Sequence, residues 1–284
     1  MIGDPALYAT ALLERLGIAE PPDVFHITRA LSVDVEERDV ASFDGALVRV
    51  KGAALGIIAV RASIRESARK RFTVAHELGH LLLPGHEHST VCSAERIENW
   101  ARDLPAPEVE ANRFAGELLV PSTIALKKFG TPKPSFTAID DIAHAFRTSL
   151  TASAYRFCEL TPYAVAVVWS SGGVVRWFKR STEFVHWIRI RERLDQGTLA
   201  HDLCRRADVS PAGAAVAAGA WLEGTFGKDD TVVEESRAIP SYDGVLTLLW
   251  LPAPLTDDRR EDELLPELDP ADFTLGRRRW PGRR

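Results

Sequence analysis

The residues that most clearly suggest a chemical role, by their identity and their spacing, are His76, Glu77 and His80. They form an H-E-x-x-H motif within RFTVAHELGHLLLPGHEH (residues 71–88). Two histidines four residues apart lie one turn above each other on a helix, so both can bind one ion at about 2.0–2.1 Å. Glu77 lies one step round the helix from His76, where it can act as a general base toward a metal-bound water. The motif predicts a catalytic zinc site, with Mn²⁺ as an alternative ion.

The alternative without a metal is that the motif consists of two histidines on a buried helix face beside a surface glutamate. A chance H-E-x-x-H in a chain of this length has odds on the order of one in a hundred. Phe72, Ala75 and Leu83 also give the same helix an apolar face. Gly79 inside a helix costs about 1 kcal/mol relative to alanine, which indicates that another segment approaches closely there. These features favour the metal site.

Two histidines do not complete such a site, and His86 is the nearest candidate for a third ligand. The metzincin pattern H-E-x-x-H-x-x-G-x-x-H places a histidine at 86, but it needs glycine at 83, where this chain has Leu83. It also needs a methionine beneath the site, and the only methionine is Met1. Pro84-Gly85 offers a different turn, so His86 stays an alternative, although we expect His86 and His88 to be bystanders in an exit turn.

The other candidate is a glutamate on a second helix, predicted from Pro107 to about Val120 within PEVEANRFAGELLVP. We prefer Glu108, because Asn112 lies one turn away on the same face and can accept the outer N–H of a ligand histidine. Glu110 lies about 200° round the helix and should face elsewhere, yet it remains an alternative ligand. Glu117 is expected to be solvated. If Glu108 binds no metal, its presence is explained by the favourable effect of a negative charge in the first turn of a helix.

The two motifs RFTVAHELGHLLL and EVEANRFAGELLVP resemble the ImmA/IrrE family of zinc metallopeptidases, most strongly over about residues 25–125. The resemblance implies that His76, His80 and Glu108 bind the metal and that Glu77 is the catalytic glutamate. It also implies a substrate, because family members cleave a helix-turn-helix repressor and so switch on a stress or mobile-element regulon. Beyond residue 125, IrrE-like members carry a helix-turn-helix-like segment and a GAF-like sensor domain.

The elements that position these residues predict an α+β protein. A small sheet and a long helix over about 63–83 belong to a zincin-like metallopeptidase domain. Strands alternate with a short helix in the C-terminal part, where a further strand is expected at 221–226. The predicted units are a metallopeptidase domain at 1–130, a helix-turn-helix-like segment at 135–160, an α+β domain at 161–255 that resembles GAF domains, and a flexible charged tail at 256–284.

Composition excludes few functions. The net charge of −5 indicates no global nucleic-acid-binding field, and three widely spaced cysteines indicate no disulfide framework. Neither a signal peptide nor a membrane-spanning run is recognisable, so we expect a cytoplasmic protein without membrane contact. The alternative function is a DNA-binding or sensory regulator, or a toxin–antitoxin component, motivated by Arg147 and Arg156. His144, Tyr155 and Tyr163 could stabilise an oxyanion, but nothing in the sequence places them near the metal.

Overall fold

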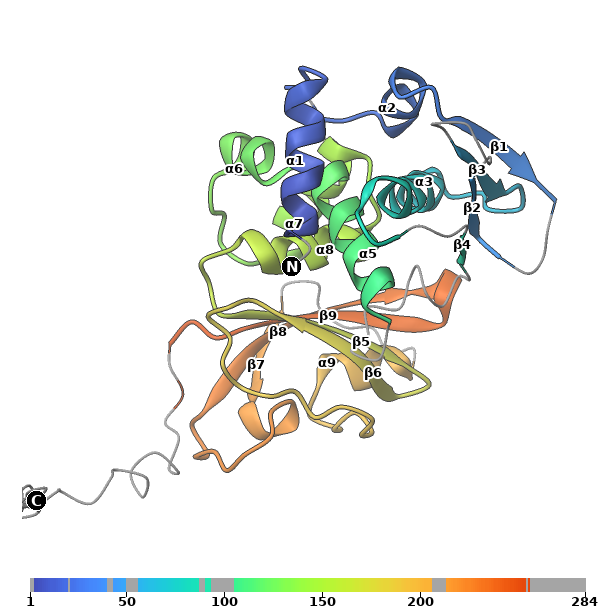
Figure 1. Cartoon of the computed structure of the whole chain (residues 1–284). Coiled ribbons are helices and arrows are strands. Elements are labelled where there is room, and N and C mark those ends of the chain that lie inside the picture. The colour runs from blue at the N-terminus through green and yellow to red at the C-terminus, as the bar shows by residue number, and fades with distance from the viewer. Residues whose placement is uncertain are drawn as a thin grey trace, which may run out of the picture.

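A computed structural model describes most of the chain (Figure 1). The described residues are 3–19, 21–39, 43–49, 56–86, 90–92 (backbone only), 105–205, 213–253 and 255. The predicted tail 256–284 and His88 lie outside them. Figure 1 shows a group of helices with a small sheet beside α3 and a larger sheet beneath them. The protein is a mixed α+β structure, as the sequence predicts.

The small sheet has the strand order β1-β3-β2-β4, in which β1 and β3 are parallel and the other pairs are antiparallel. Its strands are β1 (Asp34–Arg38), β2 (Gly45–Arg49), β3 (Gly56–Arg61) and β4 (Thr90–Cys92). One face of β2 and β3 packs against α3. Leu47, Ile58 and Val60 are buried in this contact, which gives α3 a rigid support.

The helices that carry the sequence motifs are α3 (Ser67–Leu82) and α5 (Ala106–Leu119). Pro84 follows the end of α3, and Pro121 follows α5 and begins the entry to α6 (Ser122–Phe129). The two remaining N-terminal helices are α1 (Pro5–Arg15) and α2 (Val24–Ala30), and the side chain of Asp4 caps α1 by accepting the Ala6 N–H at 3.0 Å. Every residue from 71 to 80 is buried, so α3 is the central helix of this part of the fold.

The segment predicted to resemble a helix-turn-helix forms two short helices, α7 (Phe136–Phe146) and α8 (Leu150–Leu160). Ser135 and Ser149 cap them by accepting backbone N–H groups at 3.2 Å. The turn between them is tight because Arg147 adopts a left-handed conformation with φ of 54°. Helix α8 packs on its neighbours through five buried residues, namely Ser153, Ala154, Arg156, Phe157 and Cys158.

The larger sheet is antiparallel, with the order β6-β5-β9-β8-β7. Its elements are β5 (Val165–Ser171), β6 (Val174–Arg180), α9 (Leu199–Cys204), β7 (Ala214–Ala217), η1 (Ala218–Ala220), β8 (Thr231–Ile239), η2 (Pro240–Tyr242) and β9 (Gly244–Trp250). The strand predicted at 221–226 is wrong: Trp221 is buried in the core, and only an isolated bridge joins Leu222 to Ile188.

The two faces of the larger sheet lie in different cores. Val165, Val167 and Leu248 share one hydrophobic core with the N-terminal helices, whereas Val168 and Trp221 lie in a second core on the face of α9. The helical part and the sheet are therefore packed together through a common core. The domain boundaries predicted from sequence remain a prediction.

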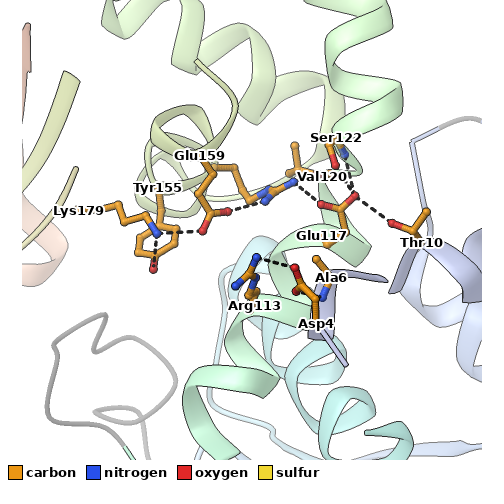
Figure 2. A network of polar contacts seen from close by, with 11 residues as sticks. Asp4, Ala6, Thr10, Arg113, Glu117, Val120, Ser122, Tyr155, Glu159 and Lys179 are labelled. Atoms are coloured by element: carbon orange, nitrogen blue, oxygen red, sulfur yellow. Dashed lines mark hydrogen bonds and ion pairs between the residues drawn. The ribbon is translucent and has the colours of Figure 1, made fainter. Parts of the chain in front are cut away.

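Polar contacts join the same parts (Figure 2). Arg156 of α8 donates to Glu117 of α5 at 2.6 Å and to Glu159 at 2.5 Å. Lys179 of β6 in turn donates to Glu159 at 3.0 Å and to the Tyr155 hydroxyl at 3.1 Å. The expectation that Glu117 is solvated is wrong, because it is buried in this network. The network links α5, through α8, to the larger sheet.

Candidate metal centre

The candidate site begins with His76 and His80, which α3 presents on one face. Both side chains are fully buried, and their Nε2 atoms lie 3.1 Å apart. The rings meet edge to face, with centroids 4.7 Å apart and planes at 77°. Both Nε2 atoms are directed at the same position, as binding of one shared cation requires.

Helix α5 approaches α3 closely at Gly79 and thereby brings Glu108 to the histidines. A Cβ atom at Gly79 would lie 3.1 Å from Cδ1 of Phe114 and 3.2 Å from Cα of Ala111. Glu108 lies one turn before Ala111 on the same helix. The sequence predicted that another segment approaches closely at Gly79; the structure shows that this segment is α5, and the contact places Glu108.

Three donor atoms converge at the centre of the site. Oε2 of Glu108 lies 3.2 Å from Nε2 of His76 and 3.7 Å from Nε2 of His80, while the two Nε2 atoms are 3.1 Å apart. Ligand atoms bound tetrahedrally at 2.0–2.1 Å are separated by roughly 3.3 Å. Among the residues that the structure describes, these three form the group of histidine and carboxylate side chains able to hold a metal ion.

The charge of Glu108 suits this role. Burial by itself raises the pKa of the carboxyl, but hydrogen bonds and charge interactions with His76 and His80 outweigh burial and hold the pKa of Glu108 well below its ordinary value. The group is therefore an anion near neutral pH. Two imidazole nitrogens and one carboxylate form a donor set that suits zinc and several other divalent ions.

Asn112 lies where the sequence predicted, behind His76. Its Oδ1 lies 2.8 Å from Nδ1 of His76, and an amide oxygen can only accept, so the imidazole donates from Nδ1. Nε2, which lies 3.2 Å from Oε2 of Glu108, is then the nitrogen that would bind a metal ion. Asn112 is buried and lies on α5, one turn from Glu108. One helix thus supplies the third donor atom and the acceptor that orients the first.

The structure corrects the expectation that His86 is a bystander. Its ring is buried, with Nδ1 at 2.9 Å from Nδ1 of His80 and Nε2 at 2.9 Å from Oε2 of Glu110. Gly85 adopts a φ of 83°, which folds the segment after α3 back toward the site. Glu110, the rival third ligand, therefore contacts His86 and is not part of the convergent group.

Arg49, which the sequence analysis missed, fixes the end of α3. From β2 its Nη2 donates to the carbonyl oxygens of His80 at 2.7 Å, Leu81 at 3.1 Å and His86 at 2.5 Å. Carbonyl groups in the last helical turn lack intrahelical partners, and a cation there is favourable. Only an alternating strand pattern around Arg49 was visible in the sequence, and this does not reveal its target.

Glu77 is fully buried and points toward the start of β2. A Cβ atom at Gly45 would lie 2.6 Å from Oε1 of Glu77 and 2.6 Å from Cγ2 of Thr73. Only glycine therefore fits at position 45, and the sheet leaves room for the carboxylate of the motif. This requirement is tertiary, so no local sequence pattern reveals it.

Tyr155, Tyr163 and His144, which the sequence offers for stabilising an oxyanion, contact other parts of the protein or solvent. Tyr155 accepts a hydrogen bond from Lys179, and burial raises the pKa of its phenol. The ring of Tyr163 packs edge to face on Trp250, and His144 is exposed on α7. These contacts assign both tyrosines to the boundary with the larger sheet.

Comparison with known proteins agrees with this geometry. Residues 28–157, which include α3, α5 and the three convergent side chains, match a peptidase family model (Peptidase_M78), so the fold and site define a peptidase-type domain. That model is described as the IrrE N-terminal-like domain, and its match to this segment supports membership of the ImmA/IrrE family.

A solved structure described as a Mycobacterium tuberculosis transcriptional regulator is similar in fold. It has 12% sequence identity and a TM-score of 0.52, and the match covers 87% of this chain and 76% of that one. No curated protein matches the chain in sequence. Within the described part of the chain, none of the helices is both long enough and apolar enough to cross a bilayer.

Proposed function

We propose that the chain is a zinc-dependent endopeptidase in which His76, His80 and Glu108 hold the metal. The observation that carries the proposal is the convergence of three buried donor atoms at 3.1, 3.2 and 3.7 Å. These separations match the roughly 3.3 Å expected around a tetrahedral zinc ion. Manganese is the alternative ion for the same donors. The peptidase family model over residues 28–157 supports the reaction class.

We assign roles to the other side chains from the H-E-x-x-H motif and from the family likeness. Zinc, when bound, lowers the pKa of a coordinated water to about 7 and polarises a carbonyl. As water attacks the peptide carbonyl, Glu77 takes up a proton from that water at its carboxylate, and it returns the proton to the leaving amine as the C–N bond breaks. Asn112 keeps the hydrogen of His76 on Nδ1. The buried surroundings of Glu77 exclude bulk water and strengthen these interactions.

The substrate that we propose is a cytoplasmic helix-turn-helix repressor, whose cleavage switches on a stress or mobile-element regulon. Family likeness supports this substrate class, because ImmA/IrrE members act on such repressors. The C-terminal sheet, by the same likeness, serves as a GAF-like sensor. The structural neighbour from Mycobacterium tuberculosis is named a transcriptional regulator, which is compatible with a regulatory role here.

The experiment incubates the purified chain, with and without Zn²⁺, with helix-turn-helix repressors encoded beside it. We expect zinc-dependent cleavage at one site, abolished by Glu77→Gln although that variant still binds one zinc ion. Retention of zinc shows that the substitution removes chemistry and not the metal. Full cleavage by Glu77→Gln would contradict the assignment of Glu77, and failure of the wild type to bind zinc would refute the metal centre.

A DNA-binding or sensory regulator is the second candidate, favoured by the α7–α8 helical hairpin. Of the two arginines that motivate it, Arg147 is exposed, but Arg156 is buried and paired with Glu117. The face of α8 around Arg156 is thereby occupied by protein contacts. Tight, salt-dependent binding of operator DNA, with no cleavage by either the wild type or Glu77→Gln, would establish this candidate over the protease.

A further inference from the structure

His86 and Glu110 form a hydrogen-bonded pair directly behind His80, and we call them the outer pair. Nδ1 of His86 lies 2.9 Å from Nδ1 of His80, and Nε2 of His86 lies 2.9 Å from Oε2 of Glu110. We infer that the outer pair positions His80 for metal binding by fixing which of its ring nitrogens carries the hydrogen. This inference rests on the metal centre proposed above and concerns residues outside its three ligands.

The hydrogen assignment follows from counting donors. A neutral imidazole has one N–H group and one acceptor nitrogen. The Glu110 carboxylate only accepts, so the hydrogen of His86 is on Nε2 and its Nδ1 must accept. His80 therefore donates from Nδ1 to His86. In the neutral form that binds a metal, its Nε2 is then free of hydrogen, and this is the atom that lies 3.1 Å from Nε2 of His76 and 3.7 Å from Glu108. Glu110 thus sets the form of His80 through His86.

The same arrangement recurs at the other histidine, with a different residue. Asn112 Oδ1 accepts from Nδ1 of His76 at 2.8 Å, as His86 Nδ1 accepts from His80 at 2.9 Å. Metal-bound histidines generally need such an acceptor, since it fixes the ring and makes the ligand nitrogen more basic. Both histidines of the motif are therefore locked in the form with Nε2 directed inward.

The fold holds the outer pair by contacts of its own. Gly85, with φ of 83°, turns the backbone so that His86 returns to the site. Arg49 joins the His80 and His86 carbonyls through one guanidinium nitrogen, at 2.7 and 2.5 Å. The ring of His86 is buried, whereas the Glu110 side chain is 26% exposed. The position of His86 is thus fixed from three elements: β2, the turn after α3, and α5.

Four variants test the inference by zinc affinity, measured by competition with a chelator. His86→Leu keeps the volume but leaves the Nδ1–H of His80 without an acceptor, and we expect zinc to bind about 10- to 100-fold more weakly. His86→Asn places an amide oxygen near the former Nδ1, as Asn112 does behind His76, and should regain most of this loss. Glu110→Leu should weaken zinc binding, whereas Glu110→Gln, which still accepts from His86, should not.

Glu117→Gln is the matched control, because it alters a buried carboxylate on the same helix that contacts Arg156 instead of a histidine. It should lower the free energy of unfolding and leave zinc affinity unchanged. Zinc affinity of His86→Leu and Glu110→Leu within twofold of the wild type would overturn the inference, and so would a His86→Asn variant as weak as His86→Leu. A wild-type chain that binds no zinc would instead refute the proposed function.

Nitrogen-15 NMR of the imidazoles in the zinc-loaded chain gives a readout that packing alone does not change. We expect hydrogen on Nδ1 of His76 and His80 and on Nε2 of His86. In Glu110→Leu, the Nε2–H form of His86 should lose its dominance. Hydrogen on Nδ1 of His86 in the wild type would reverse the direction of the contact with His80 and refute the inference.

Discussion

The close contact between α3 and α5 gives a quantitative prediction for Gly79→Ala. In an isolated helix this change is stabilising by about 1 kcal/mol. Here the new Cβ atom would lie 3.1 Å from Phe114 Cδ1, 3.2 Å from Ala111 Cα and 3.3 Å from the Ala111 carbonyl oxygen. Two of these atoms belong to the backbone of α5, so the helix itself must move by a few tenths of an ångström.

Overpacking of this kind costs about 1–3 kcal/mol, and the small displacement places the cost in the lower half of that range, about 1–2 kcal/mol. After the gain in helix propensity, we expect the metal-free free energy of unfolding to fall by up to about 1 kcal/mol. Zinc binding requires Glu108 in its original place, and returning the shifted helix against the Cβ atom adds a further cost, which we take to be about as large, about 1–2 kcal/mol. The zinc Kd should therefore rise about 5- to 25-fold, since about 1.4 kcal/mol corresponds to tenfold.

Gly116→Ala is the matched control on α5, because its Cβ atom would meet Cδ of Arg156 at 3.2 Å, and this is a side-chain atom. We expect equal or higher stability and unchanged zinc affinity. Urea unfolding of the metal-free variants and chelator competition for zinc are the two assays. If Gly79→Ala is as stable as Gly116→Ala and binds zinc as tightly as the wild type, the close approach does not position Glu108 and the reasoning is wrong.

Three further predictions concern stability and reactivity. Free zinc at about 100 times its Kd should raise the free energy of unfolding by about 2.7 kcal/mol, and Glu108→Ala should abolish most of this rise; an equal rise in both would remove Glu108 from the ligands. Asp44→Ala removes a fully buried carboxylate from two arginines and should cost about 3–5 kcal/mol in urea unfolding, against about 1 kcal/mol or less for Glu36→Gln at an exposed pair. Burial raises the pKa of the Cys158 thiol from 9.0 to about 12. Peptide mapping after alkylation of the folded chain should therefore find Cys158 less modified than the half-buried Cys204, and equal labelling of the two would contradict this. Because the Cys158 thiol ionises at lower pH in the unfolded chain, the contribution of Cys158 to stability should be lost as pH rises from about 9 toward 12.

The sequence predicted those parts of the site that depend on helical geometry. The spacing of His76 and His80, the face shared by Glu108 and Asn112, and the reason for Gly79 all follow from 3.6 residues per turn and one helix–helix contact. The predicted helix over about 63–83 corresponds to α3 at Ser67–Leu82.

The sequence did not predict contacts made by a third segment. His86 was judged only as a ligand, by the absence of glycine at 83, yet Gly85 turns the chain to place it behind His80. Glu110 does face away from the histidines of α3 round its own helix, but the returning segment brings His86 to it. Glu117 lies a quarter-turn off the helical stripe of Glu108 and is therefore expected in solvent, because helical spacing does not reveal its partner Arg156, 39 positions away in sequence. Such contacts depend on how loops close, which periodicity does not encode.

Helix α5 runs from the candidate metal centre to the ion-pair network at the larger sheet. Glu108 at its start lies in the candidate metal centre, and Glu117 nine residues later is tied through Arg156 and Glu159 to Lys179 on the larger sheet (Figure 2). Nine residues of α-helix span about 13.5 Å, so a tilt of about 5° about the Glu117 end displaces the other end by roughly 1 Å. That displacement is about half the length of a zinc–ligand bond. The stiffness of α5, together with its close contact with α3 at Gly79, is therefore what keeps the carboxylate of Glu108 within reach of the two histidines.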